Sequence, residues 1–147
     1  YSPDFDASTQ ERGFFGFDKK EDVKYILISE KGCADPSAEY SLELADGLLP
    51  LDIHTFDKDA FILENEQVHK VTLYTKEKKA CLSLHFHTPV VGLWSPPAKN
   101  APFVCIEPWY GRCDRAHYTG EYKDKDWMQH LHPDKTFKGG YTIEIEE

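Results

Sequence analysis

Apolar and polar residues alternate along several short stretches of this 147-residue chain. The alternation is clearest in residues 80–88, where large apolar side chains alternate with Ser83, His85 and His87. Successive side chains of a strand point to opposite faces, so this pattern predicts a strand with one buried face. The same alternation, or a short run of β-branched and aromatic residues, predicts further strands over residues 23–29, 40–44, 49–55, 60–63, 68–74, 90–94, 103–107 and 141–146.

The remaining stretches lack such a pattern. Residues 1–22 show no sustained period, and we expect an irregular segment whose phenylalanines pack against a sheet. Residues 30–36 are rich in turn formers and are predicted to form a loop, as are residues 115–126, while residues 127–133 are predicted to form a turn-like connection. No stretch shows the 3.6-residue period of a long helix, so the sequence predicts a single all-β domain over residues 1–147, a sandwich or a barrel.

Composition narrows the classes of partner. The chain has 26 acidic and 17 basic residues, a formal net charge of -9. Nucleic acids and anionic membrane surfaces both demand a basic footprint, so we expect neither as a partner. We find no apolar run near the ~20 residues that a membrane-spanning helix needs, and no signal-peptide pattern at the start.

The cysteines bear on the compartment. The four cysteines include no CxxC pair, and Cys81 and Cys105 lie in apolar, strand-like runs, where a free thiol packs as a small hydrophobe. We therefore expect a reduced, cytoplasmic protein, although an even number of cysteines leaves disulfides open. The first residue is Tyr1 rather than methionine, so a fragment, a processed product and a truncated form all stay open.

The most unusual stretch is residues 103–114, FVCIEPWYGRCD. It begins as an apolar strand and carries Glu107 on the face of Phe103 and Cys105, and Pro108 is predicted to end the strand. A carboxylate among apolar neighbours is costly unless it is paired or used, and partial desolvation raises a carboxyl pKa from ~4.3 toward neutrality. Glu107 is therefore the candidate general base, and the alternative is a structural glutamate paired with a nearby Arg or Lys.

Asp114 offers a second carboxylate seven residues after Glu107. Two acids that flank a sugar bond would indicate glycoside hydrolysis. The alternative is that Asp114 caps the glycine turn or pairs with Arg112 or Arg115.

Aromatic and histidine residues supply the remaining candidates. Trp94 and Trp109 can each stack on the apolar face of a sugar ring or, alternatively, fill the core. His85 and His87 have the spacing of an HxH metal pair, but a metal site needs a third ligand, and polar histidines on a solvated strand face are common. We therefore expect no metal. The chain contains no GxGxxG, P-loop, GxSxG or HExxH motif.

Two stretches resemble a known family. Residues 91–95, VGLWS, and residues 103–114 are similar to the aldose 1-epimerase (galactose mutarotase-like) family, most of all to its LacX-type branch, and residues 131–137 and 141–145 resemble the family's ending. The resemblance implies the C-terminal half of a β-supersandwich that interconverts the α and β anomers of free hexoses, such as galactose or glucose, without a metal or organic cofactor. Half of such a fold would expose strand edges and core that the other half covers.

The resemblance also implies roles for residues. The glutamate that matches Glu107 takes the proton from the C1 hydroxyl, while a histidine protonates the ring oxygen. Trp109 and Trp94 would line the sugar site, with Asp114 and His54 as further sugar-binding candidates. The family's catalytic histidines lie in its first half, and this chain has no HPxF segment. We therefore expect the acid from a missing N-terminal half or another copy of the chain.

Two alternative functions stay open. One is a non-catalytic carbohydrate-binding β-sandwich module that has lost the acid. The other is a hexose-6-phosphate 1-epimerase, in which Arg112 or Arg115 would meet the phosphate.

Overall fold

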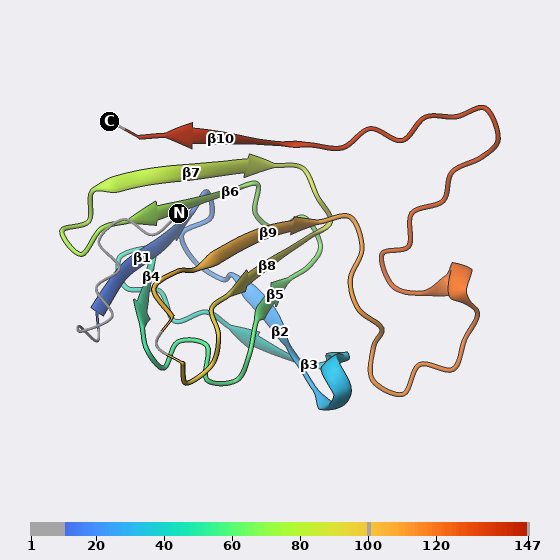
Figure 1. Cartoon of the computed structure of the whole chain (residues 1–147), viewed down its shortest axis with the longest axis horizontal. Helices are drawn as coiled ribbons and strands as arrows, with labels where there is room; N and C mark the ends of the chain where they lie inside the picture. Colours follow the sequence, from blue (N-terminus) through green and yellow to red (C-terminus); the bar gives the residue numbers. More distant parts are fainter. Residues whose placement is uncertain (1–10, 100, 147) are drawn as a thin grey trace.

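The computed structural model describes residues 11–99 and 101–146. The strands belong to two antiparallel sheets, which confirms the predicted all-β class (Figure 1). In chain order the elements are β1 (Glu11–Phe17), β2 (Lys24–Ile28), the 3-10 helix η1 (Glu30–Gly32), β3 (Ala34–Ser41), β4 (Leu48–Asp52), β5 (Phe61–Leu63), β6 (Lys70–Tyr74), β7 (Ala80–Phe86), β8 (Val90–Trp94), β9 (Cys105–Trp109), the 3-10 helix η2 (Tyr122–Asp124) and β10 (Tyr141–Ile145).

Each sheet has five strands. The first sheet has the order β10-β7-β6-β1-β4, and the second sheet has the order β3-β2-β5-β8-β9. β9 and β10 are therefore both edge strands. The predicted strands at residues 80–88 and 90–94 are confirmed as β7 and β8, with boundaries shifted by at most two residues.

The main core lies between the inner faces of the two sheets. Leu84 and Phe86 of β7 are buried in it, so the face predicted from alternation in residues 80–88 is confirmed. Burial of one such side chain contributes roughly 1.5–3 kcal/mol, which fixes the inner face of the strands that contribute to this core. The strand residues that both sheets contribute to this buried cluster include Phe15, Val71, Leu73, Leu84, Phe86, Phe61, Leu63, Val91 and Leu93.

The prediction of an irregular N-terminal segment is wrong for residues 11–17, which form β1 between β4 and β6. The pairing of β1 with β4 shifts register between Glu11 and Phe14. Gly13, with φ of 95°, lies within that irregularity, and the shift interrupts the alternation that would have revealed the strand. The rest of the segment, residues 1–10, lies outside the described residues.

Two further predictions are wrong in their boundaries. The expected loop at residues 30–36 ends early, because β3 already begins at Ala34 and continues to Ser41. The strand predicted to stop before Pro108 includes it. Among the described strands, β9 pairs with β8 alone, and an edge strand tolerates a proline whose missing N–H faces away from its neighbour. Glu107 therefore lies in the middle of a strand and not at its end.

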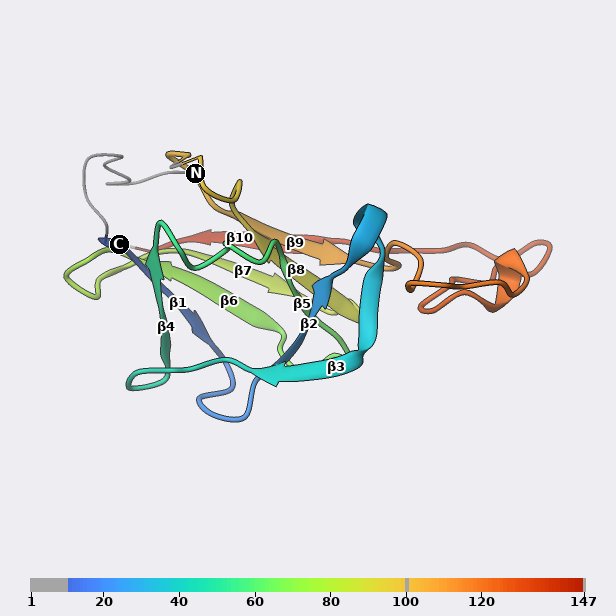
Figure 2. The ribbon, with the colours of Figure 1, turned by 90° about the horizontal axis from the view of Figure 1, so that it is seen from below.

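A long excursion separates β9 from β10. Residues 110–140 leave the sandwich, pass through η2 and return so that β10 lies beside β7 (Figures 1 and 2). The side chains of Tyr141, Ile143 and Ile145 on β10 are 62%, 54% and 66% exposed. An apolar cavity of about 470 Å³ lies between this strand, the inner face of β7 and the edge strand β9. Within the described residues, no helix is both long enough and apolar enough to cross a membrane.

Candidate functional site

The two faces of β9 have different surroundings. Val104 and Ile106 pack against the main core between the sheets, as the sequence predicts. Cys105, Glu107 and Trp109 alternate with them, so their side chains lie on the outer face of the second sheet. Trp109 packs there against a second buried cluster. Glu107 is half-buried, so a ligand on the outer face can reach its carboxylate.

A row of register partners crosses the outer face. Glu107 pairs with Gly92 of β8, Gly92 pairs with Ile62 of β5, and Ile62 pairs with Ile26 of β2. The row thus places the carboxylate of Glu107 beside a glycine and then two apolar side chains. Glu107 also lines the cavity of about 470 Å³ between β9 and β10. Ile62 and Ile26 are buried, so the space next to the acid on the outer face is that over Gly92, which has no side chain.

The indole of Trp109 occupies part of that space. A Cβ added at Gly92 would lie 2.6 Å from Cζ2 and Cη2 of Trp109. Only glycine therefore allows the ring to lie so close to the strand beside Glu107. Trp94, two residues from Gly92 on the same strand, is the register partner of Cys105, and its ring centroid lies 6.4 Å from that of Phe103. The structure thus brings Glu107, Trp109 and Trp94 together on one face.

Cys105 reports on the environment of Glu107. Burial raises the pKa of the Cys105 thiol, and the nearby Glu107 carboxylate raises it further through its charge and a hydrogen bond. The carboxylate therefore points along the outer face toward Cys105. This contact joins the acid to a neutral, partly buried neighbour.

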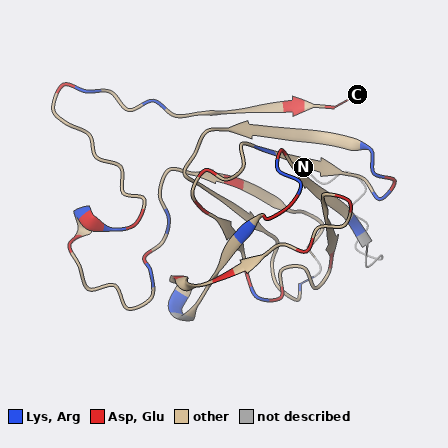
Figure 3. Cartoon of the chain, turned by 180° about the vertical axis from the view of Figure 1, so that it is seen from behind, with Lys and Arg blue, Asp and Glu red and all other residues tan. Residues whose placement is uncertain are grey.

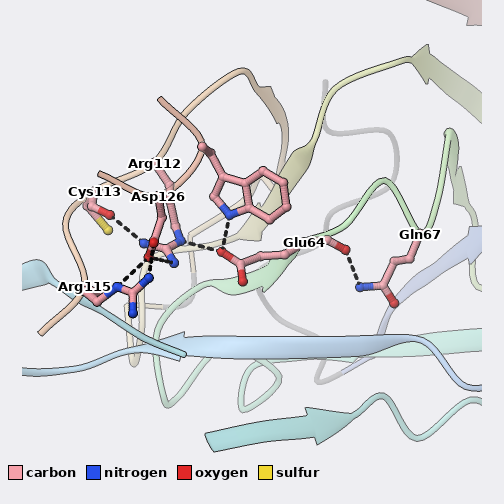
Figure 4. Close-up of polar contacts among 7 residues, drawn as sticks. Glu64, Gln67, Arg112, Cys113, Arg115 and Asp126 are labelled. Carbon is pink, nitrogen blue, oxygen red and sulfur yellow. Dashed lines mark hydrogen bonds and ion pairs between the residues drawn. The ribbon is translucent and has the colours of Figure 1, made fainter. Parts of the chain in front are cut away.

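A network of charged side chains surrounds Glu64, the residue after β5 (Figure 4). The Nε of Arg112 donates to Oε1 of Glu64 at 2.5 Å, and its Nη2 donates to Oδ2 of Asp126 at 2.6 Å. Nε1 of Trp127 donates to the same Glu64 oxygen at 2.7 Å. Arg115 forms a two-pronged ion pair with Asp126. Two guanidinium groups thus meet two carboxylates.

Three side chains of this network are largely shielded from water. The side chain of Arg112 is only 1% exposed, and those of Glu64 and Asp126 are 13% and 16% exposed. Hydrogen bonds from Arg115, and then from Arg112, hold the pKa of Asp126 below its usual value. A buried guanidinium is costly unless carboxylates compensate it, and here two of them do.

The sequence did not identify Glu64, Asp126 or Trp127 as site residues. Glu64 directly follows β5 and lies two residues after Ile62, which faces outward. The alternation of strand side chains therefore indicates that Glu64 also faces outward. Its partners come from the excursion more than forty residues away, and nothing in the local pattern predicts them. The network became visible only in the structure.

Asp114 and His54 lie elsewhere. Asp114 pairs with Lys125, whose Nζ is 2.7 Å from Oδ1, so the expected pairing with Arg112 or Arg115 is wrong because Asp126 takes both. His54 is exposed on the loop after β4, where its Nδ1 lies 2.8 Å from Oδ2 of Asp57. It lines a separate cavity near Tyr25 and Phe61. A sugar-binding role for Asp114 or His54 stays a prediction.

His85 lies in β7, on the outer side of the first sheet, and His87 follows the end of that strand. Nε2 of His85 is 2.7 Å from Oε2 of Glu144, and the ring of His87 lies 4.9 Å from that of His69, centroid to centroid. Among the described residues, no group of three or more His, Cys, Asp or Glu side chains is arranged to hold a metal ion. All four cysteines are free thiols.

Comparison with known sequences identifies relatives in lactic acid bacteria. No family model matches the chain. The plasmid and chromosomal forms of protein LacX from Lactococcus lactis subsp. lactis are each 32% identical to it over 98 residues, which is 66% of this chain and 32% of LacX. The chain thus spans about a third of the length of these curated relatives.

Solved structures extend the likeness to the whole fold. A galactose mutarotase related enzyme from Lactobacillus acidophilus superimposes with a TM-score of 0.82 and 29% identity, over 95% of this chain and 46% of that one. A galactose mutarotase-like protein from Lactobacillus casei ATCC 334 gives a TM-score of 0.72 at 21% identity, over 90% and 45% of the two chains, and so shows the fold alone. The all-β sandwich with Glu107 and two tryptophans on one face, the similarity to LacX and the structural match agree: the chain has the galactose mutarotase-like fold and is similar in sequence to LacX and to a galactose mutarotase related enzyme.

Proposed function

We propose that this chain provides the general base of an aldose 1-epimerase, which interconverts the α and β anomers of a free hexose such as galactose or glucose. The observation that supports the proposal is the position of Glu107 on the outer face of the second sheet, beside the indole of Trp109 and opposite Gly92. A half-buried carboxylate next to an aromatic platform suits an acid–base reaction on a sugar hydroxyl.

The reaction would proceed by opening and closing of the ring. Glu107 takes the proton of the C1 hydroxyl, and the electron pair of that O–H bond forms the C1 carbonyl as the bond between C1 and the ring oxygen breaks. An acid gives a proton to the ring oxygen. Rotation about C1–C2 then presents the other carbonyl face, and the two proton transfers run in reverse. Trp109 and Trp94 support the apolar face of the sugar.

We propose that the acid comes either from another part of a longer polypeptide or from a second copy of this chain. No histidine is among the described residues that line the cavity of Glu107, and His54, His85 and His87 line other cavities. The galactose mutarotase related enzyme is about twice as long as this chain. The free thiols suit a reducing compartment, and we propose the cytoplasm.

The charged residues favour a free hexose over a hexose 6-phosphate. All nitrogen atoms of the Arg112 guanidinium donate to carboxylate or carbonyl oxygens, and Arg115 is committed to Asp126. In Figure 3 the Lys and Arg residues are spread over separate loops and strands and do not gather in one patch. A phosphate would therefore have to displace a carboxylate from one of these arginines.

The test is anomer exchange measured by NMR on the complete gene product with glucose and galactose. We expect Glu107→Gln to lower the exchange rate by about 100-fold or more, because loss of a general base typically costs that much. Glu66→Gln, on an exposed loop, is the matched control and should keep the wild-type rate. Exchange no faster than in buffer would contradict the proposal. Sugar binding without exchange would favour a non-catalytic carbohydrate-binding module instead.

A further inference from the structure

The outer face of the second sheet carries a second carboxylate, Glu64. Leu63 pairs with Val91, so continuing the β5–β8 register by one residue places Glu64 opposite Val90, the register partner of Trp109. Ile62 packs outward and Leu63 inward, and Glu64 therefore lies on the face of Glu107. Two strand spacings and one step of two residues separate Glu64 from Glu107, about 12 Å between Cα atoms.

Glu64 brings a second indole onto this face. Its Oε1 accepts the hydrogen bond from Nε1 of Trp127 at 2.7 Å. Trp127 and Trp109 both pack against the same buried cluster, formed by Ile26, Ala34, Ile62 and Val90. The two indoles thus cover one buried apolar cluster, and Glu107 lies at the end of the row that includes Ile62.

Trp127 is held on two sides. Its indole N–H is bound by Glu64, and the preceding residue, Asp126, is bound by both Arg112 and Arg115. Arg112 links the two anchor points, because it donates to Glu64 and to Asp126 (Figure 4). Much of the excursion is exposed, with the side chain of Leu131 59% exposed. Trp127 is therefore one of the fixed points of the excursion.

We propose that Trp127 contacts the sugar that Glu107 deprotonates and that Glu64 is the residue that positions it. The inference rests on the proposed function. An indole fixed in advance loses little conformational freedom when a sugar binds. The sugar would lie against the half-buried indoles of Trp109 and Trp127, which cover the buried cluster, with C1 at Glu107 and its far end against Trp127. Trp127 also lines a cavity of about 500 Å³ together with Tyr110 and Phe137. Trp127 would then help to select among hexoses that differ at that end.

The test measures the equilibrium sugar affinity in a Glu107→Gln background by NMR titration, and KM and kcat in the wild-type background. We expect Trp127→Ala to raise Kd and KM about tenfold, which is the size of an aromatic contact, and to change kcat less than about threefold. Leu131→Ala, an exposed apolar residue of the same excursion, is the matched control and should bind like the parent.

The positioning role of Glu64 needs its own readout. Glu64→Gln keeps the size of the side chain and should raise Kd about threefold in a protein that has Trp127. Trp127→Phe removes the N–H that Glu64 accepts while it keeps an aromatic ring, so Glu64→Gln should add no further effect there. An equal, additive effect in both backgrounds would show that Glu64 acts only through general stability and would overturn its role.

The outcomes separate this inference from the proposed function. If Glu107→Gln abolishes exchange but Trp127→Ala and Trp127→Phe leave Kd and KM unchanged, the inference is wrong and the function stands. If no exchange is seen but sugars bind and Trp127→Ala weakens them tenfold, the function is wrong and the sugar contact stands. Absence of any sugar binding overturns both. Trp127→Phe decides the matter if Trp127→Ala does not fold.

Discussion

At the residue scale, Gly92 is a sensitive position. Its backbone φ is not in the left-handed region, so alanine fits the backbone, but the new Cβ would lie 2.6 Å from two ring atoms of Trp109. The indole must move away from Glu107, because the strand cannot. We expect Gly92→Ala to weaken sugar binding and to lower anomer exchange about tenfold, with a melting temperature close to wild type.

Gly140→Ala is the matched control for this substitution. A Cβ at Gly140 meets nothing within 4 Å, and its φ is ordinary. Sugar titration and exchange should both match the wild-type protein. A Gly92→Ala variant that also retains wild-type affinity and exchange would show that the indole of Trp109 does not need its place beside Glu107.

A thiol next to Glu107 allows a second prediction that does not depend on activity. Burial and the Glu107 carboxylate both raise the pKa of Cys105. Removing the negative charge with Glu107→Gln takes away one of the two causes, so the pKa should fall. The thiolate is the reactive form, and we therefore expect Cys105 to react several-fold faster with iodoacetamide at pH 8, followed by peptide mass spectrometry.

Cys113 is the internal reference for that measurement. Its pKa is raised chiefly by burial, with no contribution from Glu107, so its rate should be the same in both proteins. A Cys105 rate that does not change in the variant would mean that the carboxylate of Glu107 points away from it, which the proposed site does not allow.

The sequence reveals the residues of β9 better than it reveals their partners. Alternation correctly separates Val104 and Ile106 from Cys105 and Glu107, because it depends only on the geometry of one strand. The contacts of Glu64 with Arg112 and Trp127 depend on the register of three strands and on the path of a long excursion. Those are long-range properties, and no local pattern contains them.

At the element scale, strands with a regular two-residue alternation were predictable and interrupted strands were not. β7 places one apolar face in the core and is visible in the sequence. β1 lies in the middle of the first sheet but contains a register shift near Gly13, which breaks the pattern. β3 is mostly exposed and contains Pro36, so its residues resemble a loop, although it pairs with β2 at the edge of the second sheet.

Pro108 shows why an element must be judged by its place in a sheet. A proline stops a central strand, because both of its neighbours need the N–H, but it is compatible with an edge. β9 is an edge strand with β8 as its one partner among the described residues. The strand therefore continues to Trp109, and this extension carries the indole onto the same face as Glu107.

At the scale of the whole molecule, the sandwich has an open side. β9 and β10 are the edges of the two sheets on that side, and the apolar side chains of Tyr141, Ile143 and Ile145 are exposed there. Such a surface is costly in water, and monomeric proteins rarely keep a large one. The chain spans about half of the galactose mutarotase related enzyme, and the exposed face agrees with the expectation that half of this fold uncovers core.

The network around Arg112 connects the excursion to the sandwich and makes the stability of the molecule depend on pH. The Asp126 carboxylate is held by Arg115 and Arg112, so its pKa in the folded protein lies below the ordinary value of 3.8. A depressed pKa means that folding favours the charged form. The stabilisation is therefore complete above about pH 4 and is lost as the pH falls through the lower folded value.

Asp126→Asn tests this directly. The variant leaves Arg112 with Glu64 as its remaining carboxylate, and we expect it to lower the free energy of unfolding at pH 7 by about 3 kcal/mol, as for a broken buried ion pair. The lowered pKa of Asp126 means that more of the wild-type carboxyl is protonated at pH 2.5 than at pH 7, so the difference between the two proteins should be smaller at pH 2.5. Urea unfolding at both pH values measures this difference.

Asp124→Asn, an exposed neighbour in η2, is the control and should show no difference from the wild-type protein at either pH. A constant difference from pH 7 to pH 2.5 would mean that the charge of Asp126 does not hold the excursion in place.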